Sequence, residues 1–398
     1  MGRGRLLEKI NWKKAFLQAA AVGLILCTGF VFLLGGLILS NYDNLGRLFK
    51  IVYLIESRYL EDTPRVKLID GAIEGMVQAL DPYSSFQDAE ENKILMQSIQ
   101  GSFGGIGVHI STADPTQLVI ARPIKDSPAE KAGLQAGDII TKIDNTDVST
   151  LSQDEAIAIL RGEPGTKVTV GIYRPQTKED FTVELVRYKI DLPTVEAAVL
   201  PGHPEIAVID ISYFTMQTGK ELERTFAELD LDKYKGFILD LRYNYGGEIN
   251  SAVKVASYLV PGDDIVHIVD RKGNTKTQKS TAQFVNKPFV VLINEYTASA
   301  AEIVAGAIKD YGSGTLVGVK TFGKGVVQTV FPLDGMTSVR LTTNKYLTPL
   351  KNDIHQKGIE PDIKVELGKG EKPTILPTTT EFDPQLAKAV EVLLEKVK

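Results

Sequence analysis

Hydrophobic and polar positions follow different patterns in successive parts of this chain. From Asn44 to Gln100, apolar residues recur every three or four positions, which is typical of amphipathic helices, with breaks at Pro64 and Pro82. Residues 101 to about 188 open with a glycine-rich segment and continue as short β-branched runs, with one helix predicted at Gln153–Leu160. The pattern therefore predicts two or three helices followed by a small, mostly β domain.

From residue 189 onward, apolar strands alternate with helices. The runs IAVIDI, GFILDL, FVVLIN and TLVGV are predicted strands, and helices are predicted near Gly219–Leu229, Ile249–Leu259 and Ser299–Asp310. This alternation favours an α/β domain with a largely parallel sheet. Residues 384–398 are predicted to form a terminal helix.

The segment Ala15–Leu39 has no charged residue and follows five lysine or arginine residues. As a helix, its 25 residues would reach roughly 37 Å, enough to cross a hydrocarbon core of about 30 Å. The basic flank is expected to stay in the cytoplasm, which places the remaining chain outside it. A cleaved signal peptide is the alternative, but its apolar region is normally only about 7–15 residues long, so we favour a retained anchor.

Composition limits the remaining classes. A chain of 398 residues is long enough for two or three domains. Cys27 is its only cysteine, so neither an intrachain disulfide nor a site with several thiolate ligands is possible, and we expect no metal or other cofactor. The net charge is −5: the first forty residues carry +4, and the rest of the chain carries −9. This acidic remainder gives no sign of nucleic-acid binding.

Ser299 stands where a buried strand is predicted to turn into a helix, in the segment NEYTASAAEIVAGAIKD. With Glu302 three residues later, it has the S-x-x-E pattern of a helix-capping box. The N–H groups at the start of a helix would equally stabilise an oxyanion formed by attack of this serine on a carbonyl. From this segment alone, a cap and a nucleophile both remain open, the cap being favoured.

A serine nucleophile needs a base within reach. The four histidines form no recognisable constellation, and the chain has no G-x-S-x-G elbow. Lys324 lies between two glycines before the strand VVQTVF and could serve if burial lowers its pKa, while Lys320 competes with it. Gln328 would lie about 13 Å from Lys324 in a fully extended strand, so contact between them needs a bend.

Two glycine-rich segments can present backbone N–H groups. Gly246 and Gly247 follow the predicted strand ILDL, where an N–H could point into a site without a side chain in the way, although a tight turn is the default interpretation. The segment GGIGVHI lies beside a strand edge, and such an edge can capture a peptide's C-terminal carboxylate.

Taken together, these segments resemble the C-terminal processing peptidases, or tail-specific proteases, which are serine endopeptidases with a Ser/Lys dyad and an embedded PDZ domain. The resemblance covers roughly residues 45–370. It rests on ALDPYSSF (79–86), GGIGVHI (104–110), GLQAGDIITKI (133–143), ILRGEPGTKV (159–168), DLRYNYGG (240–247), NEYTASAAEIVAGA (294–307), TFGKGVVQ (321–328) and HQKGIEPDI (355–363).

The resemblance implies a role for each matching position. Ser299 would be the nucleophile, Lys324 the base and Gln328 the residue that positions the lysine. The N–H groups of Gly246 and Ala300 would form the oxyanion hole.

The implied fold is multidomain α/β, with a catalytic core similar to the Clp protease and crotonase folds. The expected parts are a basic tail (1–14), a transmembrane anchor (15–39), a helical region (40–100), the PDZ domain (101–188), the peptidase core (189–370) and a C-terminal tail with a helix (371–398).

The resemblance also implies the substrates. The PDZ edge at Gly105, Ile106, Gly107 and Val108 would select proteins with apolar, unstructured C-termini. Arg161, beside the PDZ helix, is our candidate for coupling peptide binding to assembly of the active site.

Two positions depart from the usual family pattern. Tyr245 stands where proline often precedes the paired glycines, and Ala301 stands where a second serine is common. Neither removes a catalytic group, although Tyr245 could alter the pocket beside the oxyanion site.

Two other functions remain possible at this stage. A membrane-anchored PDZ adaptor without activity would need neither Ser299 nor Lys324, and an esterase or amidase with a histidine base is disfavoured by the missing elbow. The expected location is a bacterial envelope, with the catalytic part outside the cytoplasm, and the terminal helices suggest a homodimer.

Overall fold

The computed structural model describes residues 42–398 except 112–116, 335 and 369. The predicted membrane anchor at 15–39 lies outside these residues. No helix in the described part of the chain is long and apolar enough to cross a membrane. The chain divides into two compact units, and the boundary in the sequence falls between Ala79 and Leu80.

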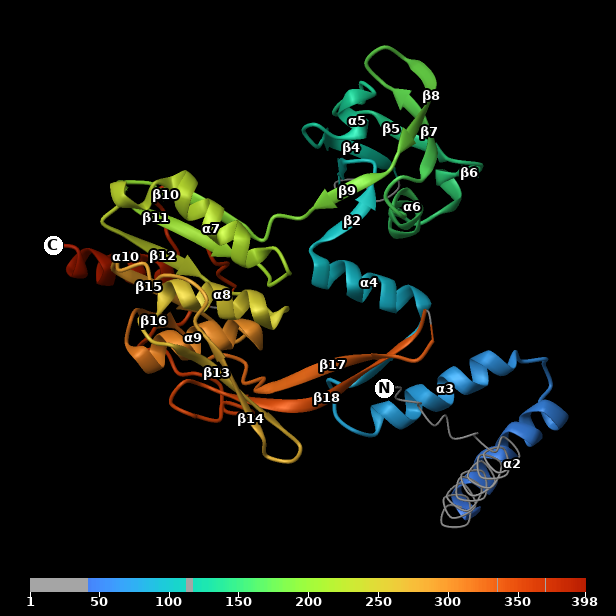
Figure 1. Ribbon diagram of the computed structural model, residues 1–398. Helices are drawn as coiled ribbons and strands as arrows, with labels where there is room; N and C mark the ends of the chain where they lie inside the picture. The colour runs from blue at the N-terminus through green and yellow to red at the C-terminus, as the bar shows by residue number, and fades with distance from the viewer. Residues whose placement is uncertain (1–41, 112–116, 335, 369) are drawn as a thin grey trace, which may run out of the picture. The chain divides into compact units, whose positions relative to one another are not determined.

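The elements follow the order expected from the sequence (Figure 1). The helices are α2 (Tyr42–Arg58), α3 (Arg65–Gln78), α4 (Ala89–Gln100), α5 (Pro128–Lys131), α6 (Gln153–Leu160), α7 (Thr218–Leu229), α8 (Ile249–Leu259), α9 (Ala300–Tyr311) and α10 (Pro384–Lys396). The strands are β1 (Ser85–Gln87), β2 (Ser102–Gly105), β3 (Val108–Ile110), β4 (Leu118–Pro123), β5 (Ile139–Ile143), β6 (Thr146–Asp147), β7 (Lys167–Arg174), β8 (Glu179–Val186), β9 (Tyr188–Asp191), β10 (Val195–Leu200), β11 (His203–Ile211), β12 (Gly236–Asp240), β13 (Asp264–Asp270), β14 (Thr275–Lys279), β15 (Phe289–Ile293), β16 (Thr315–Gly318), β17 (Val326–Pro332), β18 (Ser338–Leu347) and β19 (Ile363–Lys364).

The described part of the first unit consists of α2 and α3. Pro64 stands at the N-cap of α3, because proline is disfavoured inside a helix but accepted at its start. These two helices leave many large apolar side chains exposed, among them Phe49 at 71% and Val66 at 69%. Such surfaces usually mark a contact with another molecule.

The glycine-rich β region forms a small domain within the second unit. One sheet has the order β3-β4-β5-β7-β8, with β6 paired to β5, and a separate two-stranded sheet joins β2 to β9. Helix α6 has the predicted bounds, and its capping box joins Ser152 to Glu155. Its buried face packs with the strands through Ala156 and Leu160.

The larger part of the second unit is built on a six-stranded sheet of order β10-β11-β12-β15-β16-β19. All neighbours are parallel except β10 and β11, so the prediction of a largely parallel sheet is confirmed. Alternate residues of each strand face opposite sides, and each side is covered by helices. One face packs against α7, α8 and α9, and the other packs against α10.

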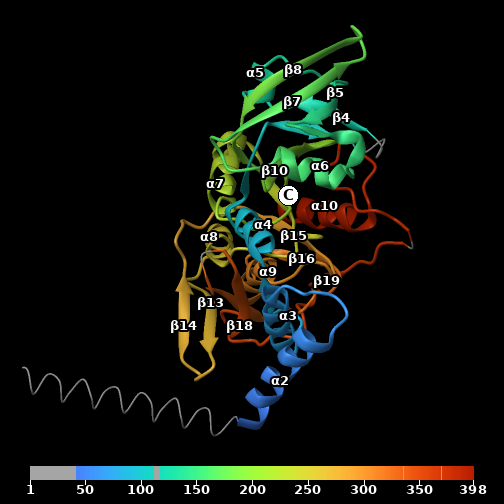
Figure 2. The ribbon, with the colours of Figure 1, turned by 90° about the vertical axis from the view of Figure 1, so that its right-hand side faces the viewer.

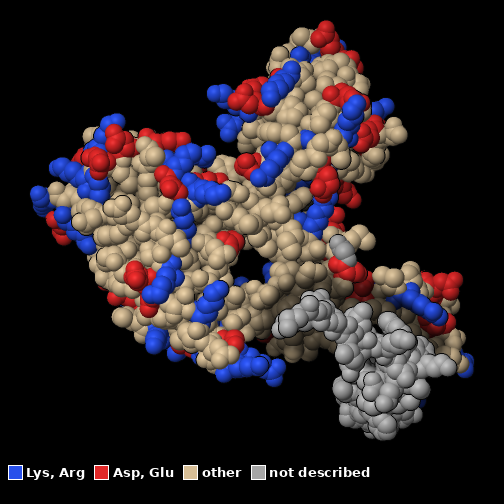
Figure 3. Space-filling model, in the orientation of Figure 1, with Lys and Arg blue, Asp and Glu red and all other residues tan. Residues whose placement is uncertain are grey.

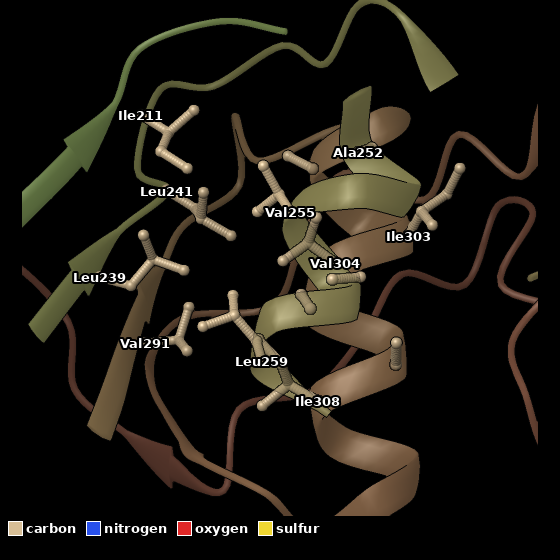
Figure 4. Packing of buried hydrophobic residues seen from close by; sticks show 14 of the residues in the cluster. Ile211, Leu239, Leu241, Ala252, Val255, Leu259, Val291, Ile303, Val304 and Ile308 are labelled. Carbon is tan, nitrogen blue, oxygen red and sulfur yellow. The ribbon is translucent and has the colours of Figure 1, made fainter. Parts of the chain in front are cut away.

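The first of these cores is seen from close by in Figure 4. Side chains of the strands, including Leu239 and Val291, point toward Val255 of α8 and toward Val304 and Ile308 of α9. Each of these side chains is fully buried or nearly so. Burial of a side chain of this size contributes about 1.5–3 kcal/mol, so this layer holds α9 firmly against the sheet.

A second, antiparallel sheet was not predicted. Its order is β1-β18-β13-β14, with β17 also paired to β18 (Figures 1 and 2). Strand β18 is ten residues long and pairs with β1, β13 and β17 over different parts of its length. It therefore brings segments from residues 85 to 347 together beside the start of α9.

Acidic and basic side chains are interspersed on the face shown in Figure 3. This mixture agrees with the small net charge of the chain.

Candidate active site

Ser299 lies at the N-cap of α9, directly after the turn that leaves β15. Its backbone has φ 54° and ψ −117°, a conformation that residues with a side chain rarely adopt. The capping box with Glu302 is present, and the Ser299 N–H donates to Glu302 Oε2 at 2.9 Å. Ser299 is thus a helix N-cap held in a strained conformation, and strain of this kind clusters at active sites.

Glu302 connects the serine to the lysine segment. Its side chain is fully buried, and its carboxylate accepts hydrogen bonds from the N–H groups of Gly323 and Lys324, each at 2.8 Å, and from the Thr321 hydroxyl. Burial raises the pKa of Glu302, while these hydrogen bonds and the one from Ser299 act to lower it. One carboxylate therefore fixes the backbones of Ser299 and Lys324 relative to each other.

Lys324 and Ser299 line the same cavity of about 440 Å³. Burial lowers the pKa of Lys324, and the positive charge of Arg340 lowers it further, while Asp81 and Glu302 act in the opposite direction. The desolvation that the sequence argument required of a lysine base is therefore present. The ammonium group lies 4.9 Å from the ring centroid of Tyr83, a cation–π contact.

Gln328 also lines this cavity, but its side chain bonds elsewhere. Its amide donates to Thr342 Oγ1 at 3.2 Å, and the Thr342 hydroxyl donates to Asp81 at 3.2 Å. Within the described residues, no hydrogen bond joins Lys324 to Gln328 or to the Ser299 hydroxyl. The bend that contact would need is present as a β-bulge between Val327 and Gln328.

The paired glycines pack directly against the serine. A Cβ on Gly246 would lie 2.8 Å from both Ser299 Cβ and the Ala300 nitrogen, so only glycine fits there. The Gly246 N–H donates to Asn244 Oδ1 at 2.8 Å. By contrast, the N–H groups of Gly247 and Ala300 have no hydrogen-bond partner in the described part of the chain. Ala300 remains available as an oxyanion donor, while Gly246 would have to share its hydrogen with Asn244.

The loop that carries these glycines is fixed by a buried ion network. Arg242 is 1% exposed and binds Asp240 at 2.7 Å and Asp383 at 3.0 Å. Asp383 also caps α10, by accepting hydrogen bonds from the N–H groups of Gln385 and Leu386. The motif DLRYNYGG is thereby tied to the C-terminal helix, 141 residues further along the chain.

The other candidate bases do not line this cavity, although His355 lies beside Tyr83 with ring centroids 6.4 Å apart. Among the described residues that line the Ser299 cavity there is no histidine. His267 bonds to Thr277 and to the Pro349 carbonyl, and His203 lies near Glu205. Lys320 pairs with Glu360 at 3.3 Å and lines a different cavity. The geometry therefore favours Lys324.

Sequence reasoning missed two aromatic residues beside the dyad, Tyr83 and Tyr346. The Tyr346 hydroxyl donates to the Ser299 carbonyl oxygen at 2.9 Å, and its backbone N–H donates to the Gly325 carbonyl at 3.0 Å. Tyr346 is fully buried, which raises its pKa well above the usual value. Tyr83 had a signal, since it lies in the quoted motif ALDPYSSF, whereas Tyr346 stands in a strand with no distinguishing pattern.

The predicted peptide-binding residues Gly105, Ile106, Gly107 and Val108 line a groove of about 240 Å³ together with residues of α6. The carbonyls of Ile106 and Gly107 accept hydrogen bonds from within the domain. The N–H groups of these two residues have no partner in the part of the chain that the structure describes. The groove thus presents free N–H donors beside an apolar wall.

Arg161 lies at one end of this groove. It lines both the groove and an adjoining cavity of about 400 Å³ that includes Ser212 and Thr215 of the larger domain. Its guanidinium lies 4.6 Å from the centroid of the Phe103 ring. The residue thereby contacts both the groove and a space that reaches the larger domain.

No group of three or more histidine, cysteine, aspartate or glutamate residues in the described ranges could hold a metal ion.

Comparisons with known proteins agree on one family. The chain matches peptidase family S41 over residues 205–365, the PDZ domain over 119–174 and the N-terminal domain of the activating protease CtpB over 38–91. It is 37% identical over 340 residues to a carboxy-terminal-processing protease of Bartonella bacilliformis, covering 84% of this chain and 77% of that protein. It is 38% identical to the carboxy-terminal processing protease CtpA of Bacillus subtilis, covering 82% and 70% respectively.

Among solved structures, a putative S41 protease from Bacteroides fragilis is 16% identical, with a TM-score of 0.50, and covers 87% of this chain and 97% of that one. At this identity the likeness concerns the fold alone.

Proposed function

Because the chain belongs to the carboxy-terminal processing proteases of peptidase family S41, which are serine peptidases, we propose that Ser299 and Lys324 form its catalytic dyad. One observation carries this proposal: the two residues line a single cavity, and Lys324 is desolvated enough for its pKa to be lowered. A neutral lysine is the form that can accept a proton from a serine hydroxyl.

The reaction proceeds by acyl transfer. Neutral Lys324 takes the proton of the Ser299 hydroxyl, and Ser299 attacks the carbonyl carbon of the substrate peptide bond. The developing oxyanion is stabilised by the Ala300 N–H and by a glycine N–H of the 246–247 pair. Lys324 then gives its proton to the leaving amine, and water releases the acyl-enzyme with the lysine again acting as base.

The lysine has to move before it can act. In this structure its ammonium lies over Tyr83, and within the described residues it makes no hydrogen bond to Ser299. A cation–π contact stabilises the protonated lysine, so it favours the form that cannot accept a proton from Ser299. Gln328 lies on the bulged strand and now bonds to Thr342. If its side chain bonded to Lys324 instead, it would hold the lysine in its active position.

Substrate recognition belongs to the PDZ groove. The free N–H groups of Ile106 and Gly107 suit a terminal carboxylate, and the apolar side chains of Ile157 and Leu160 suit an apolar last residue. We expect the protein to recognise unstructured C-terminal tails of this kind.

Arg161 would couple the groove to the catalytic domain, because it lines both the groove and the cavity that reaches Thr215. Arg161→Ala should lower kcat for tail-bearing substrates while the Kd of the tail peptide stays close to that of the parent. A proportional loss of both activity and peptide affinity would remove the coupling role.

The proposed location is the outer side of a bacterial cytoplasmic membrane, with residues 15–39 as the anchor. Its support is the sequence: an uncharged run of 25 residues after a basic flank. A homodimer is proposed from the exposed apolar side chains of α2 and α3, which a second copy of the chain could cover.

The test compares the full-length protein in detergent with Ser299→Ala and Lys324→Ala, using an unfolded substrate that ends in apolar residues and reading the products by mass spectrometry. We expect hydrolysis by the parent and a loss of kcat of about 10⁴-fold or more in each variant. Hydrolysis that persists in both folded variants would rule out the dyad. An inert parent that still binds the tail would favour a non-catalytic adaptor.

A further inference from the structure

Arg340 is a cation in the active-site cavity that lacks an acidic partner. It lies on β18, opposite Val330 of β17 and Ser85 of β1, and it lines the cavity together with Ser299 and Lys324. Its Nε is buried and has no hydrogen-bond partner, and no ion pair to Arg340 is present among the described residues. The residue as a whole is only partly buried, but a buried guanidinium N–H without an acceptor carries a desolvation cost, so Arg340 calls for an explanation.

The buried arginines Arg242 and Arg187 show what a structural role looks like in this protein. Arg242 binds two carboxylates, and Arg187 donates to the carbonyl oxygens of Ile159, Leu160 and Lys167. Each has its guanidinium satisfied from within the fold. Arg340 differs because its buried Nε finds no acceptor among the described residues.

The acids near Arg340 are already bound to other groups. Glu248 lines the same cavity, but its carboxylate caps α8 by accepting from the N–H groups of Asn250 and Ser251. Asp81 accepts from the N–H groups of Tyr83 and Ser84 and from two hydroxyl groups. Glu302 accepts its hydrogen bonds from Ser299 and from the segment 321–324. Among the described residues that line the cavity, two are cations, Lys324 and Arg340, and none is an uncommitted anion.

We propose that Arg340 binds a carboxylate of the polypeptide in the cleft, supplied by an aspartate or glutamate side chain close to the scissile bond or by a chain terminus. The guanidinium offers several N–H donors in a planar fork that matches a carboxylate, and a partly desolvated site strengthens the pairing. This inference rests on the proposed peptidase function and adds a specificity-determining residue to it.

A purely electrostatic role for Arg340, acting through Lys324, has to be separated from carboxylate binding. Loss of the guanidinium would change the basicity of Lys324 for every substrate alike. A ratio of kcat/KM values for two peptides that differ only in one charge cancels this common effect. The ratio therefore reports binding of the carboxylate by Arg340.

The experiment uses two matched peptide pairs that contain the same cleavage site. In the first pair, one peptide has glutamate and the other has glutamine at a position beside the scissile bond, and each such position is tested in turn. In the second pair, the C-terminus close to the scissile bond is a free carboxylate in one peptide and an amide in the other. The full-length parent is compared with Arg340→Gln and Arg340→Lys. Lys345→Gln is the control, because Lys345 lies on the same strand and pairs with Asp353.

We expect the parent to prefer the charged member of one pair by roughly tenfold in kcat/KM. Arg340→Gln should bring that ratio close to one, Arg340→Lys should retain part of it, and Lys345→Gln should leave it unchanged. The pair that responds identifies the source of the carboxylate. With Ser299→Ala, the Kd of the charged peptide should be lower when Arg340 is present than when it is replaced by glutamine.

A parent that hydrolyses both members of each pair equally well would overturn the proposal, even if Arg340→Gln failed to fold. An equal ratio in the parent and in folded Arg340→Gln would do the same. Failure of the peptidase function is a different result, because the parent and Ser299→Ala would then be equally inert or equally active on every peptide.

Discussion

The cavity around Ser299 and the PDZ groove are built in opposite ways. The groove takes its lining from β2, β3 and the segment between them, from α6, and from Ile190. The cavity takes its lining from α4, the loop after β12, the start of α9, and strands β13, β14, β17 and β18. Recognition of a tail needs free backbone donors and apolar surface, which a local fold supplies. Catalysis needs charges held at defined distances, which here requires segments from the whole domain.

The two sites should therefore respond differently to substitution. The positions of Ser299 and Lys324 depend on hydrogen bonds to one buried carboxylate, and a change of that carboxylate leaves several buried donors unsatisfied. The groove depends on contacts that can weaken one at a time. We expect losses in kcat from the cavity and graded changes in KM from the groove.

Apart from the proposed dyad itself, Glu302→Gln is expected to have the largest effect. Glutamine has the same size as glutamate, but an NH₂ group replaces one of the two carboxylate oxygens. That oxygen accepts hydrogen bonds from buried N–H groups, which the NH₂ group cannot do. We expect kcat to fall roughly 10²-fold, because Ser299 and Lys324 lose their common anchor, and the free energy of unfolding to fall by about 1–3 kcal/mol. Steady-state kinetics and denaturant unfolding measure the two quantities separately.

Glu221→Gln is the matched control. Glu221 is also buried and accepts hydrogen bonds from the N–H groups of Thr194 and Val195 and from the Thr194 hydroxyl. It should lose comparable stability but keep most of its kcat. Equal losses of kcat in both variants would mean that Glu302 acts only through general stability.

The same contrast explains what the sequence could predict. The helices could be predicted because amphipathic periodicity is a local property of the sequence: α6 and α8 have the predicted bounds, and α9 begins one residue after Ser299. Ser299 and Lys324 were accessible through their motifs, and the structure places both in one cavity. The domain boundaries and the individual roles of the site residues stay predictions.

The antiparallel sheet and the contacts of Tyr346 and Arg340 were not accessible. Strand β14 reads TKTQK, which has no hydrophobic alternation, since it lies at an edge of the sheet. Tyr346 bonds to Ser299 across 47 positions, and Arg340 faces Lys324 from a different strand. Contacts of this kind arise from the packing of distant segments, and a single sequence has no local signal for them.

Gly107→Ala tests the groove, with a smaller expected effect. Gly107 has φ +84°, and a Cβ there would lie 2.3 Å from Ser127 Cβ, so the loop with the free N–H groups must shift. KM for tail-bearing proteins should rise roughly tenfold, while kcat/KM for short peptides that do not reach the groove stays unchanged.

Gly133→Ala in the same domain is the control for backbone strain alone, because Gly133 has φ +78° and no neighbour within 4 Å of a Cβ. If Gly133→Ala raised KM as much as Gly107→Ala does, the groove would not be the origin of the effect.

The pH dependence of activity should come from the cavity. In the proposed mechanism neutral Lys324 is the active form, so kcat/KM should rise with pH along an acid limb whose apparent pKa lies below the usual lysine value of about 10.4. The charged groups that affect it are Arg340 from β18, Asp81 before β1 and Glu302 from α9, with the Tyr83 ring in contact.

Arg340→Gln removes a repelling cation, so the limb should move to higher pH, and the rate on a neutral peptide should fall a few-fold at pH 7. The two rates should converge at high pH. A pH profile of kcat/KM with that one peptide decides the matter, since an unmoved limb would show that Arg340 does not act on Lys324.

The smallest effect concerns stability and again separates the two regions. In the larger domain, burial and the charge of Asp240 raise the pKa of Asp210 to about 7. In the PDZ domain, burial acts to raise the pKa of Asp138, but hydrogen bonds from Arg174 and from the Gln135 N–H lower it overall. Unfolded aspartate has a pKa of about 3.9. Asp210 therefore favours the folded state at acid pH, and this contribution to stability is lost between pH 4 and about 7. Asp138 has the opposite effect: its ionised form stabilises the fold above pH 4, and this contribution is lost as acid protonates it.

Asp210→Asn should consequently raise thermal stability only modestly at pH 5, where the parent carboxyl is still protonated in the fold but already ionises in the unfolded chain. At pH 8 the variant should unfold a few degrees higher than the parent, because it no longer has to bury a charge beside Asp240. Asp138→Asn should instead destabilise the protein at both pH values, since its ion pair with Arg174 is intact above pH 4. Unfolding midpoints of the three proteins measured from pH 5 to 8 give the comparison. A gain for Asp210→Asn that is the same at pH 5 and pH 8 would mean that packing, and not the buried charge, sets the stability of this part of the catalytic domain.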